Sequence, residues 1–377
     1  MIVFENVTKV YPRTKSAAVD HLTLTVPEGE TCVLIGPSGC GKTTTLKMIN
    51  RLIEPTSGKI EVNGKNVLEQ NPVELRRNIG YVIQQIGLFP HMTVRDNIAV
   101  VPKLLGWDDS QIDDRVDELI DMVNMNPAII RTRYPRELSG GQRQRIGVIR
   151  ALAANPPVML MDEPFGAIDP INRDNLQNEF LRLQKQLKKT IVFVTHDIDE
   201  ALKMGTLIGI LQVGGKLQQF DTPEQLLSKP INDFVSDFVG SDRGLKRLNL
   251  VRVAEILRPD NYPISDTALS SEALASMKEH QTDSLLVIDG SERFIGYISL
   301  KNVQKNQGKR VGDFVQEAIA VTEETASLKD AFSEMLSVGM TYMPVIGPKN
   351  QLLGIVTVND IQAVIENEEE KCWLKSS

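Results

Sequence analysis

The sequence of 377 residues is poor in cysteine and in long apolar stretches. Its three cysteines, Cys32, Cys40 and Cys372, are too few and too scattered for a disulfide framework or a zinc site. No apolar run approaches the ~18 residues that a membrane helix requires, and the start of the chain lacks the basic and then apolar order of a signal peptide. These absences exclude a disulfide-stabilised secreted protein. They favour a cytosolic chain whose partners supply any membrane spans.

An excess of basic residues is also absent. The formal net charge is -7 and the isoelectric point is near 5.4, whereas nonspecific nucleic-acid binding needs a basic surface that displaces phosphate counterions. We therefore expect no nucleic-acid partner. What the sequence does contain is 41% hydrophobic residues over a length that usually forms two or three domains.

Residues 1–240 alternate short apolar runs with helix-like segments. The runs at residues 31–36, 157–162 and 190–195 show no period of two, as expected of strands that are buried on both faces. This alternation predicts an α/β domain with a mostly parallel sheet. Residues from about 88 to 155 have the pattern of helices with polar loops, and they predict a helical subdomain inserted into that domain.

An internal repeat follows the first domain. Aligning Gly296 with Gly354 gives an offset of 354 - 296 = 58 residues, which also superposes Met277 on Met335. The repeat predicts two similar α+β units. The expected organisation, in chain order, is an α/β domain at 1–240, a linker at 241–250, repeat units at 251–307 and 308–367, and a tail at 368–377.

The segment GPSGCGKT fits the phosphate-loop pattern G-x-x-x-x-G-K-[ST], and it lies between a predicted strand and a predicted helix. Its glycines let backbone N–H groups turn toward an anion, and the helix N-terminus favours negative charge. We expect Lys42 to reach the β- and γ-phosphates of a nucleoside triphosphate, and the Thr43 hydroxyl to ligate Mg²⁺. The alternative, a chance match in a glycine-rich turn, is disfavoured by the flanking strand and helix. The expected nucleotide-contacting residues are Gly36, Pro37, Ser38, Gly39, Cys40, Gly41, Lys42, Thr43 and Thr44.

Two acidic residues, Asp162 and Glu163, follow the apolar run VMLM in the segment VMLMDEP. A carboxylate at the C-terminal end of a strand faces the ligand crevice of an open α/β sheet, so Asp162 is expected to hold Mg²⁺ and Glu163 to address the attacking water. The alternative is a helix-capping acidic pair ahead of Pro164. The phosphate loop upstream favours catalysis.

Three further polar residues stand at or near predicted strands. His196 follows the run at 190–195, Gln84 follows another β-like run, and Tyr11 lies ahead of the phosphate loop. Taken singly, each has a structural alternative: a satisfied histidine donor, an ordinary surface glutamine, or a packed tyrosine. A functional role for these three residues can be inferred only together with the other motifs of the chain.

A second glycine-rich corner, LSGGQ, contains Ser139, Gly140, Gly141 and Gln142 directly before an apolar-periodic helix. Together with GPSGCGKT and VMLMDEP, it resembles the nucleotide-binding subunit of an ABC transporter over roughly residues 1–240. The resemblance implies a P-loop NTPase (ABC ATPase) fold with ATP and Mg²⁺ as cofactors. It also implies a homodimer, in which this corner closes over the ATP held by the phosphate loop of the other copy. The alternative, a plain helix N-cap, is disfavoured by the adjacent motifs.

The same resemblance implies roles for single residues. It assigns Tyr11 to adenine stacking, Gln84 to Mg²⁺ and to coupling with the permease, and Asp169 to contact across the dimer. His196 is assigned to the γ-phosphate. With Glu163 as the base, the expected catalytic residues are Glu163, His196 and Gln84.

The 58-residue repeat resembles paired CBS domains. In the second copy Gly354, Thr357 and Asp360 match the family ending G-x-x-[ST]-x-x-D, whose last two residues often contact a ribose. In the first copy Asn302 replaces the acid, which speaks against nucleotide binding there. The resemblance implies regulation by ionic strength or by an adenine nucleotide such as cyclic di-AMP. The alternative is a pair of domains that only packs and dimerises.

An ABC ATPase joined to two CBS units is similar to the ATPases of the glycine betaine, carnitine and choline uptake systems. That resemblance implies transmembrane permease subunits, an extracytoplasmic or permease-fused substrate-binding protein, and a place on the cytoplasmic face of the bacterial cell membrane. Residues 86–91 offer an apolar surface beside Gln84 for a permease helix. Because the solute never touches this subunit, another betaine-like solute such as ergothioneine, or a bile-exclusion exporter, stays open.

Two other classes of function are weaker matches. Soluble ABC proteins of DNA repair have long coiled-coil insertions and those of translation have two ATPase halves, and neither feature is visible in the sequence. A CBS ligand sensor with a degenerate ATPase is disfavoured by the intact Lys42, Asp162 and Glu163.

Overall fold

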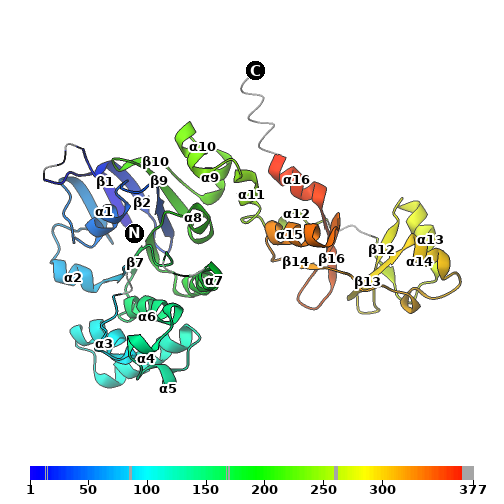
Figure 1. The fold of residues 1–377 in the computed structure, drawn as a ribbon, viewed down its shortest axis with the longest axis horizontal. Helices are drawn as coiled ribbons and strands as arrows, with labels where there is room; N and C mark the ends of the chain where they lie inside the picture. The colour runs from blue at the N-terminus through cyan, green and yellow to red at the C-terminus, as the bar shows by residue number, and fades with distance from the viewer. Residues whose placement is uncertain are drawn as a thin grey trace. The chain divides into compact units, whose positions relative to one another are not determined.

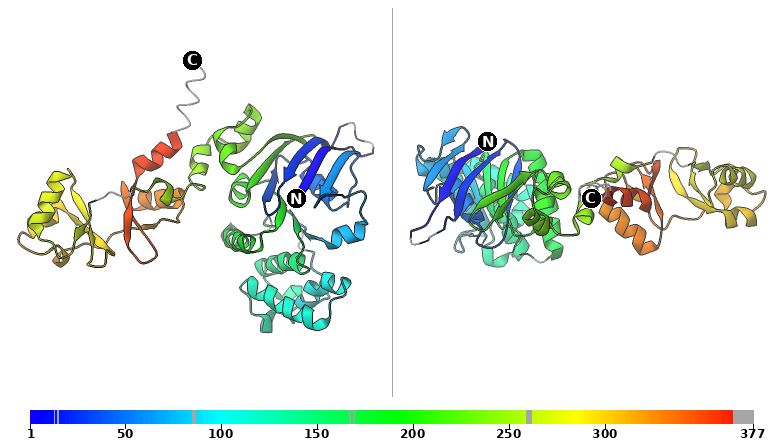
Figure 2. Two further views of the ribbon diagram at one scale, coloured as in Figure 1. Left: turned by 180° about the vertical axis from the view of Figure 1, so that it is seen from behind. Right: turned by 90° about the horizontal axis from the view of Figure 1, so that it is seen from above.

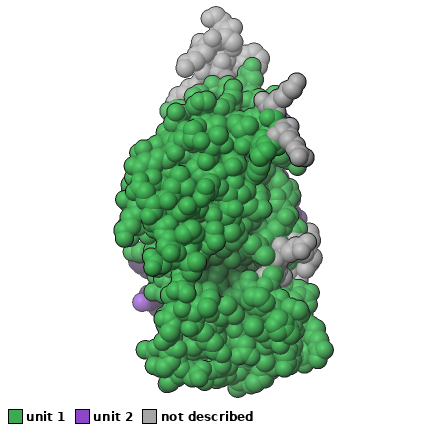
Figure 3. Space-filling view, turned by 90° about the vertical axis from the view of Figure 1, so that its left-hand side faces the viewer, with its two compact units in different colours: residues 1–239 green, residues 240–377 purple. Residues whose placement is uncertain are grey.

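The structure is a computed structural model that describes residues 1–12, 14, 16–84, 87–166, 168, 170–258 and 262–366. The chain forms two compact units, residues 1–239 and 240–377, which are coloured separately in Figure 3. The predicted fold class is confirmed: unit 1 is α/β with a helical insertion, and unit 2 contains two α+β repeats.

The central sheet of unit 1 consists of β3 (Thr31–Ile35), β6 (Ile79–Val82), β7 (Val158–Asp162), β8 (Thr190–Val194), β9 (Leu207–Gln212) and β10 (Lys216–Asp221). The strand order is β10-β9-β3-β8-β7-β6. All residues of β3, β7 and β8 are buried, and these strands run parallel to their neighbours. Burial on both faces explains why their sequences are unbroken apolar runs. β10 closes one edge in the antiparallel direction.

A smaller antiparallel sheet is built from β1 (Ile2–Lys9), β2 (Val19–Val26), β4 (Ser57–Val62) and β5 (Lys65–Asn66). Helix α1 (Lys42–Ile49) buries Leu46, Met48 and Ile49 in one hydrophobic core with strands of both sheets. This core holds the N-terminus of α1, where the phosphate loop ends, against the strand ends of the central sheet.

A layer of helices is inserted between β6 and β7, and it stands apart from the sheets in Figure 1 and in the left view of Figure 2. Each long helix buries an apolar stripe, as Ile112, Val116 and Leu119 do on the second of them. The layer consists of α3 (Val94–Leu104), α4 (Asp109–Met122), α5 (Pro127–Ile130), the 3-10 turn η1 (Pro135–Glu137) and α6 (Gly140–Leu152).

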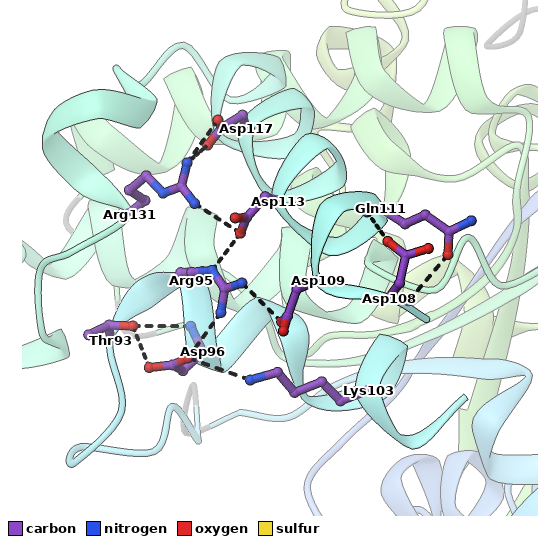
Figure 4. A network of polar contacts seen from close by, with 10 residues as sticks. All are labelled: Thr93, Arg95, Asp96, Lys103, Asp108, Asp109, Gln111, Asp113, Asp117 and Arg131. Carbon is purple, nitrogen blue, oxygen red and sulfur yellow. Dashed lines mark hydrogen bonds and ion pairs between the residues drawn. The ribbon is translucent and has the colours of Figure 1, made fainter. Parts of the chain in front are cut away.

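An ion-pair network joins α3, α4 and the segment that leads to α6 (Figure 4). Arg95 and Arg131 both contact Asp113 of α4, at 2.5 Å and 2.9 Å. The hydrogen bond from Arg95 lowers the pKa of Asp113 below its usual value. In addition, the backbone N–H groups of Val94 and Arg95 donate to the carbonyl oxygens of Arg133 and Arg131. The start of α3 and the approach to α6 are therefore held together.

The remaining helices of unit 1 cover the central sheet or follow it. Helix α7 comes after β7, α8 comes after β8 and packs on β3, and two short helices end the unit. These helices are α2 (Pro72–Arg77), α7 (Pro170–Leu187), α8 (Ile198–Met204), α9 (Pro223–Ser228) and α10 (Asp233–Val239).

Unit 2 contains the same arrangement twice, as the 58-residue repeat predicts. Each copy has a three-stranded sheet with one parallel and one antiparallel pair, and a helix between its first two strands. The first copy contains β11 (Ile264–Ser265), α13 (Ser270–Glu279), β12 (Ser284–Ile288), β13 (Phe294–Ser299) and α14 (Leu300–Lys305). The second contains β14 (Thr322–Glu323), α15 (Leu328–Val338), β15 (Tyr342–Ile346), β16 (Leu352–Thr357) and α16 (Val358–Glu366).

The two copies exchange the segments that precede them. Arg258, which comes before the first strand of the first copy, forms a two-way backbone bridge at 3.1 Å with Ile355 in β16 of the second copy. Gln316, which comes before the first strand of the second copy, forms the same bridge at 2.9 Å with Tyr297 in β13 of the first. Both pairs of equivalent residues are 58 apart, since 316 - 258 = 58 and 355 - 297 = 58. The exchange is therefore reciprocal.

As a result, the spatial halves of unit 2 do not coincide with the sequence repeats at 251–307 and 308–367. Val253, in helix α12 (Val253–Ile256), is buried in the core around the second sheet. Val311, in the 3-10 turn η2 (Val311–Asp313), is buried in the core around the first. The repeat boundaries show which residues of the two copies are similar in sequence. The spatial halves of unit 2 are instead determined by which segments pair through their backbones.

The stretch expected to be a linker, residues 241–250, also belongs to unit 2. It forms helix α11 (Arg243–Arg247), which packs on α16. Leu248 is buried in the core of the second half. The stretch is mostly polar, so its sequence suggested a linker, but burial of Leu248 attaches it to unit 2. The expected tail, residues 368–377, lies outside the described residues.

Candidate active site

The phosphate loop connects β3 to α1, and two of its glycines, Gly36 and Gly41, pack closely against the backbone of other segments. Gly41 has a φ of 97° directly before the first residue of α1. A Cβ at Gly41 would lie 2.1 Å from the Ala18 carbonyl oxygen, and one at Gly36 would lie 2.1 Å from the Leu211 carbonyl oxygen. Both positions therefore require glycine.

Lys42 is held by the loop that precedes it. Its side chain is almost fully buried, and its ammonium group donates hydrogen bonds to the carbonyl oxygens of Gly36 at 2.7 Å and Pro37 at 3.1 Å. The Sγ atom of Cys40 lies 3.7 Å from the same nitrogen. This places a positive charge within the loop, where an anion bound by the loop would meet it.

Thr43 and Asp162 meet at the start of α1 and the end of β7. The Thr43 hydroxyl donates a hydrogen bond to Asp162 Oδ1 at 3.0 Å. Asp162 is 7% exposed, and burial raises its pKa while the hydrogen bond from Thr43 opposes that rise. A hydroxyl and a carboxylate are hard oxygen ligands of the kind that suit Mg²⁺, which usually binds through one or two carboxylates, waters and substrate phosphates.

Three polar side chains from the ends of neighbouring strands lie together, with Gln84 and His196 on either oxygen of the Glu163 carboxylate. Glu163 directly follows β7, while Gln84 follows β6 and His196 follows β8, the two strands that flank β7. Gln84 Nε2 donates to Glu163 Oε2 at 2.7 Å, and His196 Nδ1 lies 3.2 Å from Glu163 Oε1. Carboxyl ends of parallel strands border the ligand crevice in this type of sheet. A carboxylate, an amide and an imidazole thus lie together at one edge of the sheet.

Glu163 itself has an unusual backbone conformation, with a φ of 46°. Positive φ is uncommon for residues other than glycine, and such conformations cluster at functional sites. The Glu163 N–H donates to the Val194 carbonyl oxygen at 2.9 Å. The chain therefore turns sharply at the end of β7, so that adjacent Asp162 and Glu163 have different neighbours.

Tyr11 lies next to the phosphate loop. Its hydroxyl is 3.3 Å from the Thr44 hydroxyl, and the Lys9 ammonium stands 5.4 Å from the centre of its ring. The structure thus brings together residues that are 33 positions apart in the sequence.

The Ser-Gly-Gly corner begins α6 in the helical layer, whereas the phosphate loop begins α1 against the sheets (Figure 1). Ser139 Oγ accepts from the Gln142 N–H at 3.2 Å, and the Gln142 side chain accepts from the Ser139 N–H at 3.0 Å, which completes a capping box. Ser139 and Gly140 are exposed, and a Cβ at Gly141 would meet nothing closer than 4.0 Å. This corner is an accessible helix N-terminus. Asp169 lies outside the described residues.

Two buried polar residues near the site were not identified from the sequence. Gln144 of α6 is 3% exposed and donates to the Pro164 carbonyl oxygen, which links the helical layer to the loop after Glu163. Glu200 of α8 is 6% exposed, and burial raises its pKa. Helix α6 is buried on more than one side, so the helical period of its apolar residues does not show that Gln144 is buried.

Comparisons with known proteins identify the families of the two parts of the chain. Residues 19–166 match the family model described as ABC transporter, and residues 253–308 and 311–367 match the model described as CBS domain. Unit 1 is similar to the dimeric ATP-binding cassette MJ0796 bound to ADP and Pi, with a TM-score of 0.53 and 31% identity over 59% of this chain and 99% of that chain. Fold and site together define an ABC-type ATPase.

Relatives that match nearly the full length of the chain identify the family within the ABC-type ATPases. The chain is 50% identical to the glycine betaine/carnitine/choline transport ATP-binding protein OpuCA of Bacillus subtilis, over 95% of this chain and 94% of that protein. It is 48% identical to the osmoprotectant import ATP-binding protein OsmV of Salmonella typhimurium, over 95% and 94%. The chain belongs to this family of ABC transporter ATP-binding subunits with C-terminal CBS domains, which confirms the resemblance drawn from its motifs. As a member, the chain is an ATP-hydrolysing subunit that uses ATP and Mg²⁺, and homologous ABC ATPases work as dimers with transmembrane permease partners.

Proposed function

We propose that this chain is the ATP-hydrolysing subunit of a bacterial importer for a betaine-type quaternary amine such as glycine betaine, carnitine or choline. The convergence of Gln84 and His196 on Glu163, next to the pair formed by Thr43 and Asp162, supports the catalytic part of the proposal. The solutes after which the full-length relatives are named support the class of solute.

In this proposal the phosphate loop and Lys42 bind the β- and γ-phosphates of ATP, and Tyr11 stacks on the adenine. Thr43, Asp162 and Gln84 hold Mg²⁺, which supplies positive charge at the phosphate oxygens. The short distance between the Thr43 hydroxyl and the Asp162 carboxylate supports their assignment to one ion.

Glu163 is the proposed base. It accepts a proton from a water whose oxygen attacks the γ-phosphorus, while the bond from that phosphorus to the bridging oxygen breaks and leaves ADP and phosphate. Gln84 orients the Glu163 carboxylate through the contact at 2.7 Å. His196, which is 64% exposed at its side chain, is free to reach the γ-phosphate.

The accessible N-terminus of α6 supports the dimer part of the proposal. Ser139, Gly140 and Gly141 present backbone N–H groups and a positive helix end, which together favour an anion. We assign this corner to the γ-phosphate held by a second copy. Asp169 is assigned to contact across the same dimer.

A groove whose lining includes Gly87 and Phe89, part of the apolar stretch expected at residues 86–91, supports docking of a permease segment; Ile86 lies outside the described residues. The groove has a volume of about 300 Å³, and Phe89 is 40% exposed. Its walls come from the central sheet and the helical layer, so a bound segment would contact both. The lining residues are Arg77, Ile79, Gly80, Tyr81, Gly87, Phe89, Val100, Val101, Arg150, Ala151, Ala154 and Pro156.

No helix in the described part of the chain has the length and apolar character needed to cross a membrane. We place the subunit on the cytoplasmic face of the bacterial membrane through its permease partners. An extracytoplasmic or permease-fused substrate-binding protein delivers the solute.

The CBS pair is proposed to regulate uptake. In the second copy, the Thr357 hydroxyl donates to Asp360 Oδ2 at 2.6 Å, and Arg258 pairs with the other carboxylate oxygen. An adenine nucleotide such as cyclic di-AMP, bound through a ribose at Thr357 and Asp360, would compete with Arg258 for this carboxylate.

The catalytic proposal is tested with the purified full chain. Glu163→Gln should lower ATP turnover by ~10²-fold or more while ATP still binds, and the ATP-bound dimer should accumulate in size-exclusion chromatography. Wild-type turnover in this variant would assign the base to another residue.

Adding Ser139→Asp to Glu163→Gln tests the dimer. Aspartate is a good N-cap, so α6 should stay folded, but its charge would face the γ-phosphate and the ATP-dependent dimer should disappear. Adding Ser139→Asn instead, which caps without charge, is the matched control. Equal dimer formation by the Asp and Asn variants would show that the corner does not face the phosphate.

A further inference from the structure

Two helices of unit 1 begin directly after loops that border the candidate site. Helix α7 begins at Pro170, at the end of the loop that follows Glu163. Helix α8 begins at Ile198, two residues after His196. Any contact between the first turns of these helices therefore links the loop after β7 to the loop that carries His196.

Two polar pairs join α7 to α8. Arg173 and Gln177 are four residues apart on α7 and so share one face of it. Arg173 Nη1 lies 3.7 Å from Asp197 Oδ2, and Gln177 Nε2 donates to Glu200 Oε1 at 3.1 Å. Asp197 is the N-cap of α8, and Glu200 lies in its first turn.

The guanidinium of Arg173 contacts both loops. Its Nη2 donates to the Ile168 carbonyl oxygen at 3.1 Å, in the loop after β7. Its other partner, Asp197, uses Oδ1 to accept the N–H groups of Asp199 and Glu200 at 2.9 Å and 3.2 Å, so that Oδ2 faces Arg173. One planar side chain thus bridges a backbone carbonyl in one loop and the residue next to His196 in the other.

The chemistry of this bridge requires arginine. A guanidinium presents several N–H donors in a fixed fork, whereas a lysine ammonium is a single point charge that cannot span two separated acceptors in the same way. The Arg173 and Asp197 side chains are 31% and 36% exposed, and such partly exposed ion pairs contribute little to global stability. The bridge is therefore suited to fixing local geometry rather than to holding the fold together.

We propose that Arg173 is a positioning residue for ATP hydrolysis, which holds the loop after β7 and the His196 loop in one arrangement. The proposal rests on the function proposed above. The contact of 3.2 Å between His196 and Glu163 depends on both loops, so their relative position decides whether base and imidazole address the same phosphate.

The experiment measures ATP turnover against ATP concentration for the purified full chain. Arg173→Met should lower kcat by about tenfold or more, because small displacements of reacting groups are costly. The KM for ATP should change less than about twofold, since Lys42 and the phosphate loop are untouched. Arg173→Lys should not restore kcat.

Asp197→Asn keeps the cap of α8 but removes the charge, so it should reproduce the loss. The double variant with Arg173→Met should lose no more than either single variant, because both remove the same interaction. The matched control is Asp174→Asn. It removes an ion pair of 2.5 Å with Lys203, which joins the same two helices without contacting either loop.

Each outcome has a definite meaning. The inference is overturned if Arg173→Met lowers kcat no more than Asp174→Asn, if Arg173→Lys restores kcat, or if the loss of activity follows a lower unfolding temperature that Asp174→Asn does not share. A wild-type chain without ATP turnover would instead overturn the proposed function. Normal turnover in the wild type and in Arg173→Met would overturn only the role of Arg173.

Discussion

Asp162 and Glu163 are adjacent carboxylates in different surroundings. Asp162 belongs to a buried strand and accepts a hydrogen bond from Thr43, whereas Glu163 is turned by its positive φ toward Gln84 and His196. Burial raises the pKa of Asp162, so the nucleotide-free chain carries a carboxylate that a bound cation would stabilise. Two different roles for neighbouring acids follow from their environments rather than from residue type.

Asp162→Asn should stabilise the nucleotide-free chain at neutral pH. Because the pKa of Asp162 is raised in the folded state, the folded chain binds its proton more tightly than the unfolded chain, and the ionised group lowers stability as pH rises through the folded pKa. The gain in unfolding temperature should therefore be present at pH 7 and vanish below about pH 4. Each kcal/mol corresponds to about 2–4 °C for a unit of this size. The stabilisation by MgATP should be lost.

Thermal unfolding over a pH series, with and without MgATP, measures both effects. Asp289→Asn in unit 2 is a control of opposite sign. Hydrogen bonds from the backbone N–H groups of Arg293 and Ser291 lower the pKa of Asp289, so its ionised form stabilises the fold and its removal should lower the unfolding temperature at pH 7. A nucleotide-free Asp162→Asn chain that melts below the wild type at pH 7 would contradict the burial argument.

At the scale of elements, the exchanged segments of unit 2 explain why each repeat has a glycine in its last strand. A Cβ at Gly354 in β16 would lie 2.1 Å from the Arg258 carbonyl oxygen, and one at Gly296 in β13 would lie 2.1 Å from the Gln316 carbonyl oxygen. Both glycines have positive φ, 157° and 148°. They allow the incoming segment to approach the strand closely enough for backbone hydrogen bonds.

Gly354→Ala should destabilise unit 2. The added methyl group would force Arg258 away from β16 and break the bridge to Ile355, at a cost of about 1–3 kcal/mol or more. Gly290→Ala is the matched control, because a Cβ there would meet nothing within 4 Å. Differential scanning calorimetry of the full chain measures the transition of unit 2. Equal transitions for the two variants would mean that the close approach is not needed.

At the scale of the whole molecule, the described residues of the candidate active site all lie in unit 1, and each unit has hydrophobic cores of its own. We therefore expect ATP hydrolysis to require no residue of unit 2. The boundary falls between Val239 and Gly240, ahead of α11 rather than after it.

A chain ending after Val239 should hydrolyse ATP with an unchanged KM and remain soluble. A chain ending after Leu250 would keep Leu248 without the core that buries it, and should aggregate more readily. ATPase assays and light scattering on the two truncated chains test the boundary. If the longer chain is the more soluble one, residues 240–250 belong with unit 1.

Much of this molecule could be predicted from short stretches of sequence. The apolar runs of β3, β7 and β8, the phosphate loop and the helix that begins after Ser139 depend on residues close together in the chain, so local patterns reveal them. The reciprocal exchange in unit 2 could not be predicted. The repeat shows which residues are equivalent, but not which copy each segment joins.

What the sequence alone determined is the chemical inventory: glycines where the backbone must turn, a lysine and a threonine at a helix start, and acids at a strand end. Only the tertiary structure decided which of these groups meet. Gln84 and Glu163 are 79 residues apart, and Arg173 reaches both Ile168 and Asp197, because strand order places β6, β7 and β8 side by side. Strand order arises from pairing and burial across the whole core, and no short stretch of sequence contains that information.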